Sequence, residues 1–544
     1  MISVYGLRLC ENSSTDLKIC LIIFTSPRLI YRDSISKEGL EMTSYFMLTF
    51  SGKNNLKILF VASEAAPFAK VGGLGEVMFS LPRSLRRIGH DARVMIPRYL
   101  SIDQEKFNLK MVAEGLKVPT GGEYEPLICN VKLFNSADND SPAPTYFLEN
   151  EEYYEKRANV YGYSDDSIRW ALLCRGALEF IKTSEWKPDI IVASDWQAGL
   201  IPNYLHTDYK DDPDLKKIAV LFSIHNIGFQ AAFDHHFTTE MNYDSGQAEI
   251  PSIYDPKFLR LNFMRRGIMY ADVINTVSPT YAQEITTPEY GELLNDLLAE
   301  RRSVLYGILN GIDYDEWNPA TDNNLSFNFN YKTLDERDKN KAVLQRKFNL
   351  PEDEHAFFVG IVSRLTDQKG FDMIMACGDS LFNNFNIQLV VIGTGDGKYI
   401  TFFEELRQRH PKKLAIHLSY DPILPRLIYG GADAMLIPSK YEPCGLTQME
   451  AMRYGAVPIV RKTGGLADSV DDFDFENNTG DGFVFENYDN YALFGTVIRA
   501  MEVNKHKKIW KKIQERAMKK DFSWDKSASE YAKILTKAIE FHAK

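Results

Sequence analysis

Short apolar runs that alternate with glycine-containing loops and helix-length segments constrain the fold of this chain more than any other feature. The first run covers residues 57–62, and a loop with Gly72 and Gly73 follows it. An amphipathic stretch and a second apolar run at 92–97 come next. A strand, a glycine loop, a helix and another strand in this order predict a βαβ unit with parallel strands.

Strand-length apolar runs recur in two series, and a segment at 318–340 that is rich in Asn and Asp separates them. Such a segment indicates a domain boundary. We therefore expect an α/β fold with two doubly wound parallel-sheet domains. In such folds ligands bind at the carboxyl ends of the strands, here in a cleft between the domains. The predicted strands are 57–62, 92–97, 189–193, 219–224 and 272–277 in the first series, and 357–362, 388–392, 415–418, 434–438 and 457–460 in the second.

Composition and charge exclude several classes of protein. Hydrophobic residues make up 44% of the chain and charged residues 25%, which excludes a disordered chain. The net charge of −11 disfavours nucleic acid as a partner. Six scattered cysteines without a CxxC pair predict neither a disulfide framework nor a metal site, and reduced thiols favour a cytoplasmic protein. No apolar stretch approaches the roughly 20 residues of a membrane span, so we expect no membrane partner.

The first 46 residues differ from the rest of the chain. Their apolar run at 20–24 is shorter than the core of a secretory signal, and their acidic residues argue against a transit peptide. We expect an extension that lies outside the folded core. The expected divisions are an extension at 1–54, a first domain at 55–320, a second domain at 321–524 and a terminal helix at 525–544.

The glycine-rich loop after the first predicted strand contains Lys70, Gly72 and Gly73. Glycines let backbone N–H groups approach an anion, and the following helix N-terminus adds positive potential. The loop is not a dinucleotide fingerprint, because Met78 stands where that motif has its third small residue. From the loop alone, a plain turn with a surface lysine is an equal alternative.

Other polar residues also follow predicted strands. Asp195 and His225 each come directly after a strand of the first series, and Arg364 and Lys369 flank a turn in the second. A guanidinium and an ammonium group suit a diphosphate. Each of these residues also has an ordinary structural interpretation when it is taken alone.

The segment 441–450 is the richest in candidate functional residues. Pro443 and Gly445 interrupt the chain before a predicted helix, so the amides of residues 445–447 could face an anion. Glu442 precedes this turn and Glu450 follows it. The spacing of these two carboxylates does not fix their distance and therefore does not indicate a glycosidase.

Together these segments resemble the bacterial and plant glycogen and starch synthase family, from about Lys57 to the C-terminus. The motifs occur in the order of that family, and Glu76 stands where the family usually has Asp. They are 70–75 (KVGGLG), 225–227 (HNI), 310–313 (NGID), 363–370 (SRLTDQKG), 442–448 (EPCGLTQ) and 463–468 (TGGLAD).

The resemblance implies a GT-B fold, in which two Rossmann-like domains face a cleft and a terminal helix crosses back to the first domain. It also implies transfer of glucose from ADP-glucose to the non-reducing 4-hydroxyl of an α-1,4-glucan, with retention of configuration. ADP-glucose is then a co-substrate, and neither a cofactor nor a metal is required. The sequence does not indicate the oligomeric state.

The resemblance also implies roles for individual residues. Arg364 and Lys369 neutralise the departing diphosphate, His225 lies beside the glucose, and Glu442 binds the donor sugar. These four residues are the predicted catalytic group. The predicted substrate-binding residues are Lys70, Gly72 and Gly73 on the first domain, Asp195 near the sugar, Tyr420 on the base, Cys444, Gly445, Leu446 and Thr447 in the turn, and Glu450 on the ribose.

Three other functions are alternatives to this one. One is a related transferase that uses UDP-glucose or makes a small disaccharide. Another is a catalytically silent glucan-binding scaffold, which the presence of Arg364, Lys369 and Glu442 disfavours. A two-domain binding protein of the periplasmic type is excluded by the same residues and by the lack of a signal peptide in this sequence.

Overall fold

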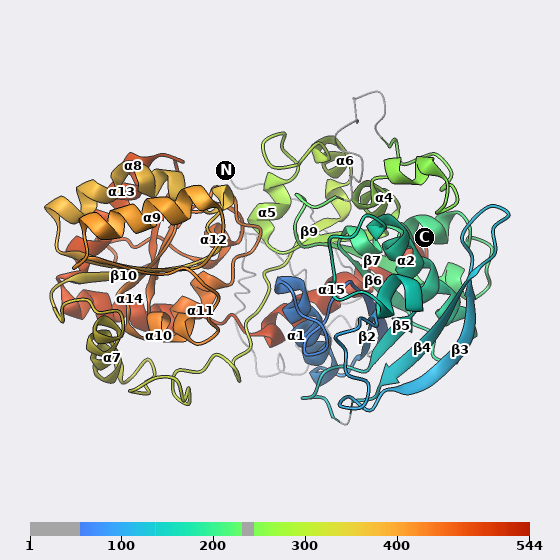
Figure 1. The fold of residues 1–544 in the computed structure, drawn as a ribbon, viewed down its shortest axis with the longest axis horizontal. Helices are drawn as coiled ribbons and strands as arrows, with labels where there is room; N and C mark the ends of the chain where they lie inside the picture. The colour runs from blue at the N-terminus through green and yellow to red at the C-terminus, as the bar shows by residue number, and fades with distance from the viewer. Residues whose placement is uncertain (1–54, 137, 231–243) are drawn as a thin grey trace, which may run out of the picture. The chain divides into compact units, whose positions relative to one another are not determined.

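The structure is a computed structural model, and it describes residues 55–136, 138–230 and 244–544 (Figure 1). The extension predicted at 1–54 lies outside the described residues. Within the described ranges, no helix is both long and apolar enough to cross a membrane.

The first sheet has nine strands in the order β3-β4-β5-β2-β1-β6-β7-β8-β9. β1 pairs in parallel with both β2 and β6, as the βαβ pattern predicts. β3 and β4 instead form an antiparallel pair at one edge, which the sequence did not predict. The strands are β1 (Lys57–Val61), β2 (Asp91–Pro97), β3 (Lys110–Val118), β4 (Leu127–Phe134), β5 (Thr145–Glu149), β6 (Ile190–Ser194), β7 (Ala219–Ile224), β8 (Val273–Thr276) and β9 (Leu305–Gly307).

The second sheet has six strands, all parallel, in the order β12-β11-β10-β13-β14-β15. Its central strand alternates between two apolar cores: Phe357 and Val359 pack on one face, and Phe358 packs on the other. Burial on both faces explains why these strands read as continuous apolar runs. The strands are β10 (Phe357–Val362), β11 (Ile387–Ile392), β12 (Leu414–His417), β13 (Ala434–Ile437), β14 (Val457–Arg461) and β15 (Phe483–Phe485).

Helices cover both sheets (Figure 1). In chain order they are α1 (Gly73–Arg87), α2 (Asp166–Thr183), α3 (Leu200–His206), α4 (Phe263–Tyr270), α5 (Pro279–Glu284), α6 (Asn295–Glu300), α7 (Leu334–Lys347), α8 (Phe371–Asn384), α9 (Gly397–Arg409), α10 (Leu424–Gly431), α11 (Thr447–Arg453), α12 (Gly464–Ser469), α13 (Asn490–Asn504), α14 (Lys507–Lys519) and α15 (Trp524–His542).

The last helix, α15, packs against α1 and against strands β6, β7 and β8 of the first sheet (Figure 1). Its side chains Tyr531 and Leu535 are completely buried there. The Tyr531 hydroxyl accepts a hydrogen bond of 2.9 Å from the Asn275 amide of β8. The helix that the resemblance predicted to cross back to the first domain is therefore confirmed.

Several hydrogen bonds join the part of the chain that forms the first sheet to the part that forms the second. The backbone N–H of Ile312 donates to the carbonyl of Phe522 at 2.8 Å, just before α15. The Ser278 hydroxyl donates to the Pro443 carbonyl at 2.7 Å. Asp468 at the end of α12 accepts from both the backbone and the hydroxyl of Thr280, each at 2.7 Å. These contacts bring the end of β8 next to the 442–444 turn.

Candidate active site

A cavity of about 210 Å³ lies at the carboxyl ends of β10 and β13. This is the edge at which parallel sheets bind ligands. Six of the predicted residues line it, so the structure brings the central part of the prediction together in one place. They are Arg364, Lys369, Glu442, Gly445, Leu446 and Thr447.

Lys369 and Glu442 form an ion pair inside this cavity, with 2.5 Å between the amino nitrogen and a carboxylate oxygen. The Ser439 hydroxyl donates to the same carboxylate at 2.9 Å. Lys369 is held here by the next residue, Gly370, whose φ is +73°. A Cβ at Gly370 would lie 2.0 Å from the Pro438 carbonyl oxygen, so the turn requires glycine.

Glycines also shape the turn that carries Glu442. A Cβ at Gly464 would lie 1.9 Å from the Glu442 carbonyl oxygen. The N–H of Gly465 donates to that same carbonyl at 3.0 Å. From the other side, the Gln448 side chain donates to the carbonyls of Cys444 and Gly445. The backbone of the turn is therefore fixed by its neighbours, and its side chains are pre-positioned.

Cys444 belongs to this turn but does not line the cavity. The residue is buried, and burial raises the pKa of its thiol to about 12. The thiol is therefore protonated at neutral pH and is not a nucleophile.

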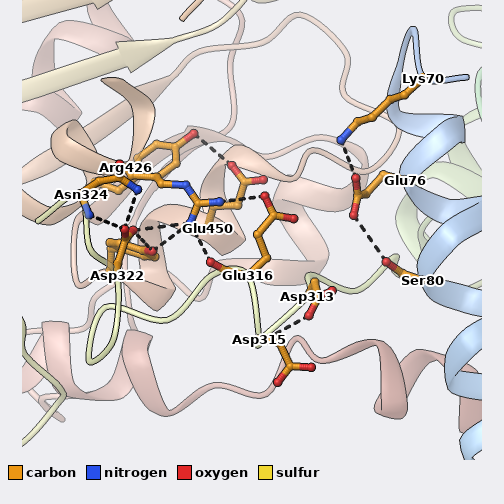
Figure 2. Close-up of polar contacts among 12 residues, drawn as sticks. Lys70, Glu76, Ser80, Asp313, Asp315, Glu316, Asp322, Asn324, Arg426 and Glu450 are labelled. Atoms are coloured by element: carbon orange, nitrogen blue, oxygen red, sulfur yellow. Dashed lines mark hydrogen bonds and ion pairs between the residues drawn. The ribbon is translucent and has the colours of Figure 1, made fainter. Parts of the chain in front are cut away.

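Glu450 lies on α11, where its carboxylate accepts a hydrogen bond of 3.1 Å from the Tyr429 hydroxyl. Burial, and to a smaller extent the nearby carboxylates of Glu316 and Glu76, raise the pKa of Glu450 to about 7. Arg426 faces the same region and forms an ion pair of 2.7 Å with Glu316 (Figure 2). The sequence analysis missed both Glu316 and Arg426, although Glu316 closely follows the 310–313 motif.

Tyr420, predicted to contact the base, is 86% exposed in the turn between β12 and α10. It does not line the cavity. Its role stays a prediction.

The glycine-rich loop before α1 binds a carboxylate of the chain itself. The N–H groups of Val71 and Gly72 both donate to Glu64, the latter at 3.0 Å. Lys70 pairs with Glu76 at 2.5 Å (Figure 2). These amides therefore do not stand free for an anion, and substrate binding by Lys70, Gly72 and Gly73 stays a prediction. Glu64 was missed, although it also closely follows a strand.

Asp195 and His225 lie together at the carboxyl ends of β6 and β7. The Asp195 carboxylate accepts a hydrogen bond of 2.7 Å from the His225 backbone N–H. Asp195 has a φ of +56°, a strained conformation for a residue with a side chain, and such strain is concentrated at functional sites. Burial raises the pKa of Asp195 to about 7 and lowers that of His225 to about 4. The imidazole is therefore neutral at pH 7.

Comparison with known proteins shows the family to which the chain belongs. Two family models match the chain: the starch synthase catalytic domain over residues 57–300 and glycosyl transferases group 1 over residues 343–517. The glycogen synthase of Thermotoga petrophila is 41% identical over 493 residues, which cover 89% of this chain and 99% of that protein. The glycogen synthase of Geotalea daltonii is also 41% identical, over 88% of this chain and 98% of its own length.

Solved structures show the same relationship. The catalytic domain of starch synthase IV from Arabidopsis thaliana, bound to ADP and acarbose, superposes with a TM-score of 0.76 at 31% identity. The match covers 89% of this chain and all of that one. Sucrose-phosphate synthase from Thermosynechococcus elongatus shares the fold, with a TM-score of 0.52 at 16% identity. The chain therefore belongs to the glycogen and starch synthase family of GT-B glycosyltransferases.

Proposed function

We propose that this protein transfers glucose from ADP-glucose to the 4-hydroxyl at the non-reducing end of an α-1,4-glucan, with retention of configuration. The observation that carries the proposal is the Lys369–Glu442 pair in the cavity at the end of β10 and β13, with Arg364 beside it. The relatives named glycogen synthase and the ADP bound to the starch synthase structure support this choice of donor and acceptor.

Arg364 and Lys369 act on the leaving diphosphate. As the bond between glucose and the diphosphate breaks, negative charge grows on the bridging oxygen, and cations fixed nearby stabilise it before any solvent rearranges. Lys70 adds positive charge from the first domain once it leaves Glu76. These side chains perform the charge neutralisation that other transferases assign to a metal.

Glu442 accepts hydrogen bonds from the hydroxyl groups of the donor glucose. Its carboxylate also holds the Lys369 amino group, so one residue orients both the sugar and the cation. Such orientation lowers the entropic part of the barrier.

His225 acts as a neutral hydrogen-bonding group beside the glucose. With a pKa of about 4 the ring is uncharged at neutral pH, so it is not a general acid, but its remaining N–H can still donate a hydrogen bond. Asp195 fixes the backbone of His225, and the Ser223 hydroxyl lies 3.3 Å from the ring nitrogen Nε2. Glu450 and Tyr420 contact the ribose and the base.

The test incubates the purified protein with glycogen and either ADP-glucose or UDP-glucose, and measures release of the nucleoside diphosphate. We expect ADP release, accompanied by new α-1,4 linkages in the proton NMR spectrum of the glucan. Release from UDP-glucose alone would overturn the choice of donor, and release from neither would favour a silent glucan-binding scaffold. New β linkages would contradict retention.

A further inference from the structure

The short helix α5 contacts both the loop that carries His225 and the turn that carries Glu442. It begins just after β8, and β8 pairs with β7, the strand that His225 directly follows. Ser278 is the N-cap of α5, because its hydroxyl accepts the backbone N–H of Tyr281 at 3.1 Å. Ser278 and Tyr281 are 0% and 1% exposed, and neither lines the cavity of the proposed active site.

Tyr281 holds the loop that follows β7. The backbone N–H groups of His225 and Asn226 donate to the Asp195 carboxylate, at 2.7 and 3.5 Å. The next N–H along the chain, that of Ile227, donates to the Tyr281 hydroxyl at 3.2 Å. Because Ile227 is buried, loss of this hydroxyl would leave its N–H without that acceptor, and the loop would have to shift.

Ser278 holds the turn on the other side. Its hydroxyl donates to the Pro443 carbonyl at 2.7 Å, one residue after Glu442. The same carbonyl accepts the N–H of Gly465 at 3.2 Å. The Ser278 backbone is itself confined, since a Cβ at Gly307 of β9 would lie 2.2 Å from the Ser278 carbonyl oxygen. The Glu442 turn therefore has a fixed contact with the first sheet domain.

Two more residues of α5 contact α12, so the helix is fixed at both ends. Thr280 donates to Asp468 through its backbone and its hydroxyl, each at 2.7 Å. Glu284 accepts from the Thr463 hydroxyl at 2.9 Å and from the Gly464 N–H at 3.0 Å. A helix of six residues is marginal by itself, so these contacts determine where α5 lies.

We propose that α5 is a positioning element for glucose transfer, with Ser278 and Tyr281 as its positioning residues. One turn of one helix holds the backbone next to His225 and the backbone next to Glu442, which belong to different sheets. The separation of these two predicted catalytic groups is therefore set at α5. The inference rests on the proposed function, because that reaction gives both groups their roles. A misplacement of about 1 Å costs on the order of 10²-fold in rate, so such a contact affects catalysis.

A purely structural role of α5 is the alternative that the test must exclude. If Tyr281 only stabilised the fold, its loss would lower the amount of active enzyme by the same factor whether or not His225 is present. If Tyr281 acts through His225, its loss has little effect once the imidazole has been removed. A double-mutant cycle on these two residues separates the two cases.

The test measures ADP release from ADP-glucose and glycogen by variants of the full chain. Tyr281→Phe removes the hydroxyl and keeps the ring. Tyr209→Phe is the matched control, because the buried Tyr209 hydroxyl donates to Glu179 at 2.8 Å and does not line the cavity. We expect Tyr281→Phe to lower kcat about tenfold and to keep the KM for ADP-glucose within about twofold of the control. In a His225→Ala background the same substitution should change kcat less than about twofold.

Amide hydrogen exchange gives a second readout, which does not depend on activity. Tyr281→Phe should speed exchange at Ile227. Ser278→Ala should lower kcat and speed exchange at Gly465, which shares the Pro443 carbonyl with the Ser278 hydroxyl. Since Ser278→Ala also removes an N-cap, its control is Asp489→Ala, which removes the cap of α13 and should speed exchange in that helix alone.

Equal losses of kcat from Tyr281→Phe in the unmodified and the His225→Ala backgrounds would overturn the proposal. So would a Tyr281→Phe variant with the kcat of Tyr209→Phe, or one in which exchange at Ile227 is unchanged.

If Tyr281→Phe does not fold, Ser278→Ala takes its place in a cycle with Glu442→Gln, and equal losses of kcat in both backgrounds would again overturn the proposal. A lack of ADP release from the unmodified chain would contradict the proposed function instead. The exchange measurements would then still show whether α5 holds the two loops.

Discussion

At the scale of single residues, the Lys369 amino group is the most direct test of the proposed active site. Lys369→Ala should lower the rate of ADP release about 10²- to 10³-fold, because it removes a fixed cation from the place where charge develops. Lys440→Ala is the matched control: this exposed lysine lies near the same turn and does not line the cavity. Circular dichroism should show both variants folded. Lys369→Ala with the turnover of the control would exclude the assignment.

Glu450 gives a second prediction at the scale of single residues, and this one concerns the stability of the fold. Its pKa is raised to about 7 from an ordinary value near 4.5, so the folded state holds a proton that the unfolded state releases. The protonated carboxyl therefore adds to the free energy of unfolding. This stabilisation is complete below about pH 4.5 and is lost as the pH rises through 7. Glu450→Gln should therefore make unfolding by urea less pH-dependent, by on the order of 2 kcal/mol between about pH 5 and about pH 8.

Glu404→Gln, on an exposed position of α9, is the control and should leave the pH dependence unchanged. The comparison isolates Glu450 from Asp195 and His225, whose shifted pKa values affect both variants alike. An identical pH slope in Glu450→Gln and Glu404→Gln would show that the carboxyl is not desolvated.

Sequence reasoning found residues that a strand end and a motif both mark, such as Lys369 and Glu442. It missed Arg426, whose role depends on a partner 110 positions away in the chain, Glu316. It expected the Gly72 amide to face an anionic ligand; in the structure this amide donates to Glu64 of the chain itself, and substrate binding there stays a prediction. Spacing along the chain identifies groups that can bind, but not which of them the protein itself already satisfies.

At the scale of helices and strands, part of the structure also could not be predicted from the sequence, but for a different reason. The parallel strands are buried on both faces, so their apolar runs are visible in the sequence. β3 is largely exposed at the edge of its sheet, with side chains such as Met111 and Val112 facing solvent. A strand without a buried face has no periodicity to detect, so the antiparallel edge could not be predicted.

The end of α15 provides a prediction at this scale. The His542 ring lies 3.2 Å from the Asp272 carboxylate, and this hydrogen bond raises the pKa of His542 above its ordinary 6.5. The resulting stability is complete below about pH 6.5 and is lost as the pH rises through the raised value. After allowance for solvent screening, it amounts to on the order of 0.5 kcal/mol.

His542→Gln should therefore speed amide exchange in the last turn of α15 at about pH 6 and have less effect at about pH 8. His355→Gln is the control, because His355 is exposed and 3.6 Å from Glu354 in a loop. A pH-independent effect of His542→Gln would mean that the ring acts through packing alone.

At the scale of the whole molecule, the hydrophobic cores do not follow the order of the segments along the chain. The core around the first sheet includes Trp524, Tyr531, Ile534 and Leu535, which come from the last helix. The second sheet packs its own two cores. The first sheet domain is therefore completed only when the end of the chain folds onto it. The buried residues of the two cores around the second sheet include none from α15, although Met449, Met452 and Val460 of the second domain pack into the first core.

A chain that stops after Asp521 should consequently lose the first domain and keep the second. Burial of four large side chains is worth on the order of 10 kcal/mol at roughly 1.5–3 kcal/mol each, which is comparable to the whole stability of a domain. We expect the truncated chain to unfold in urea in one cooperative transition, that of the second domain. Its near-ultraviolet circular dichroism should be weaker than that of the complete chain. A peptide of residues 522–544 added in trans should restore the lost signal, whereas the same peptide with Tyr531→Asp and Leu535→Asp should not, because it cannot enter the core. A truncated chain that unfolds as the complete one does would show that α15 covers the first domain without completing its core.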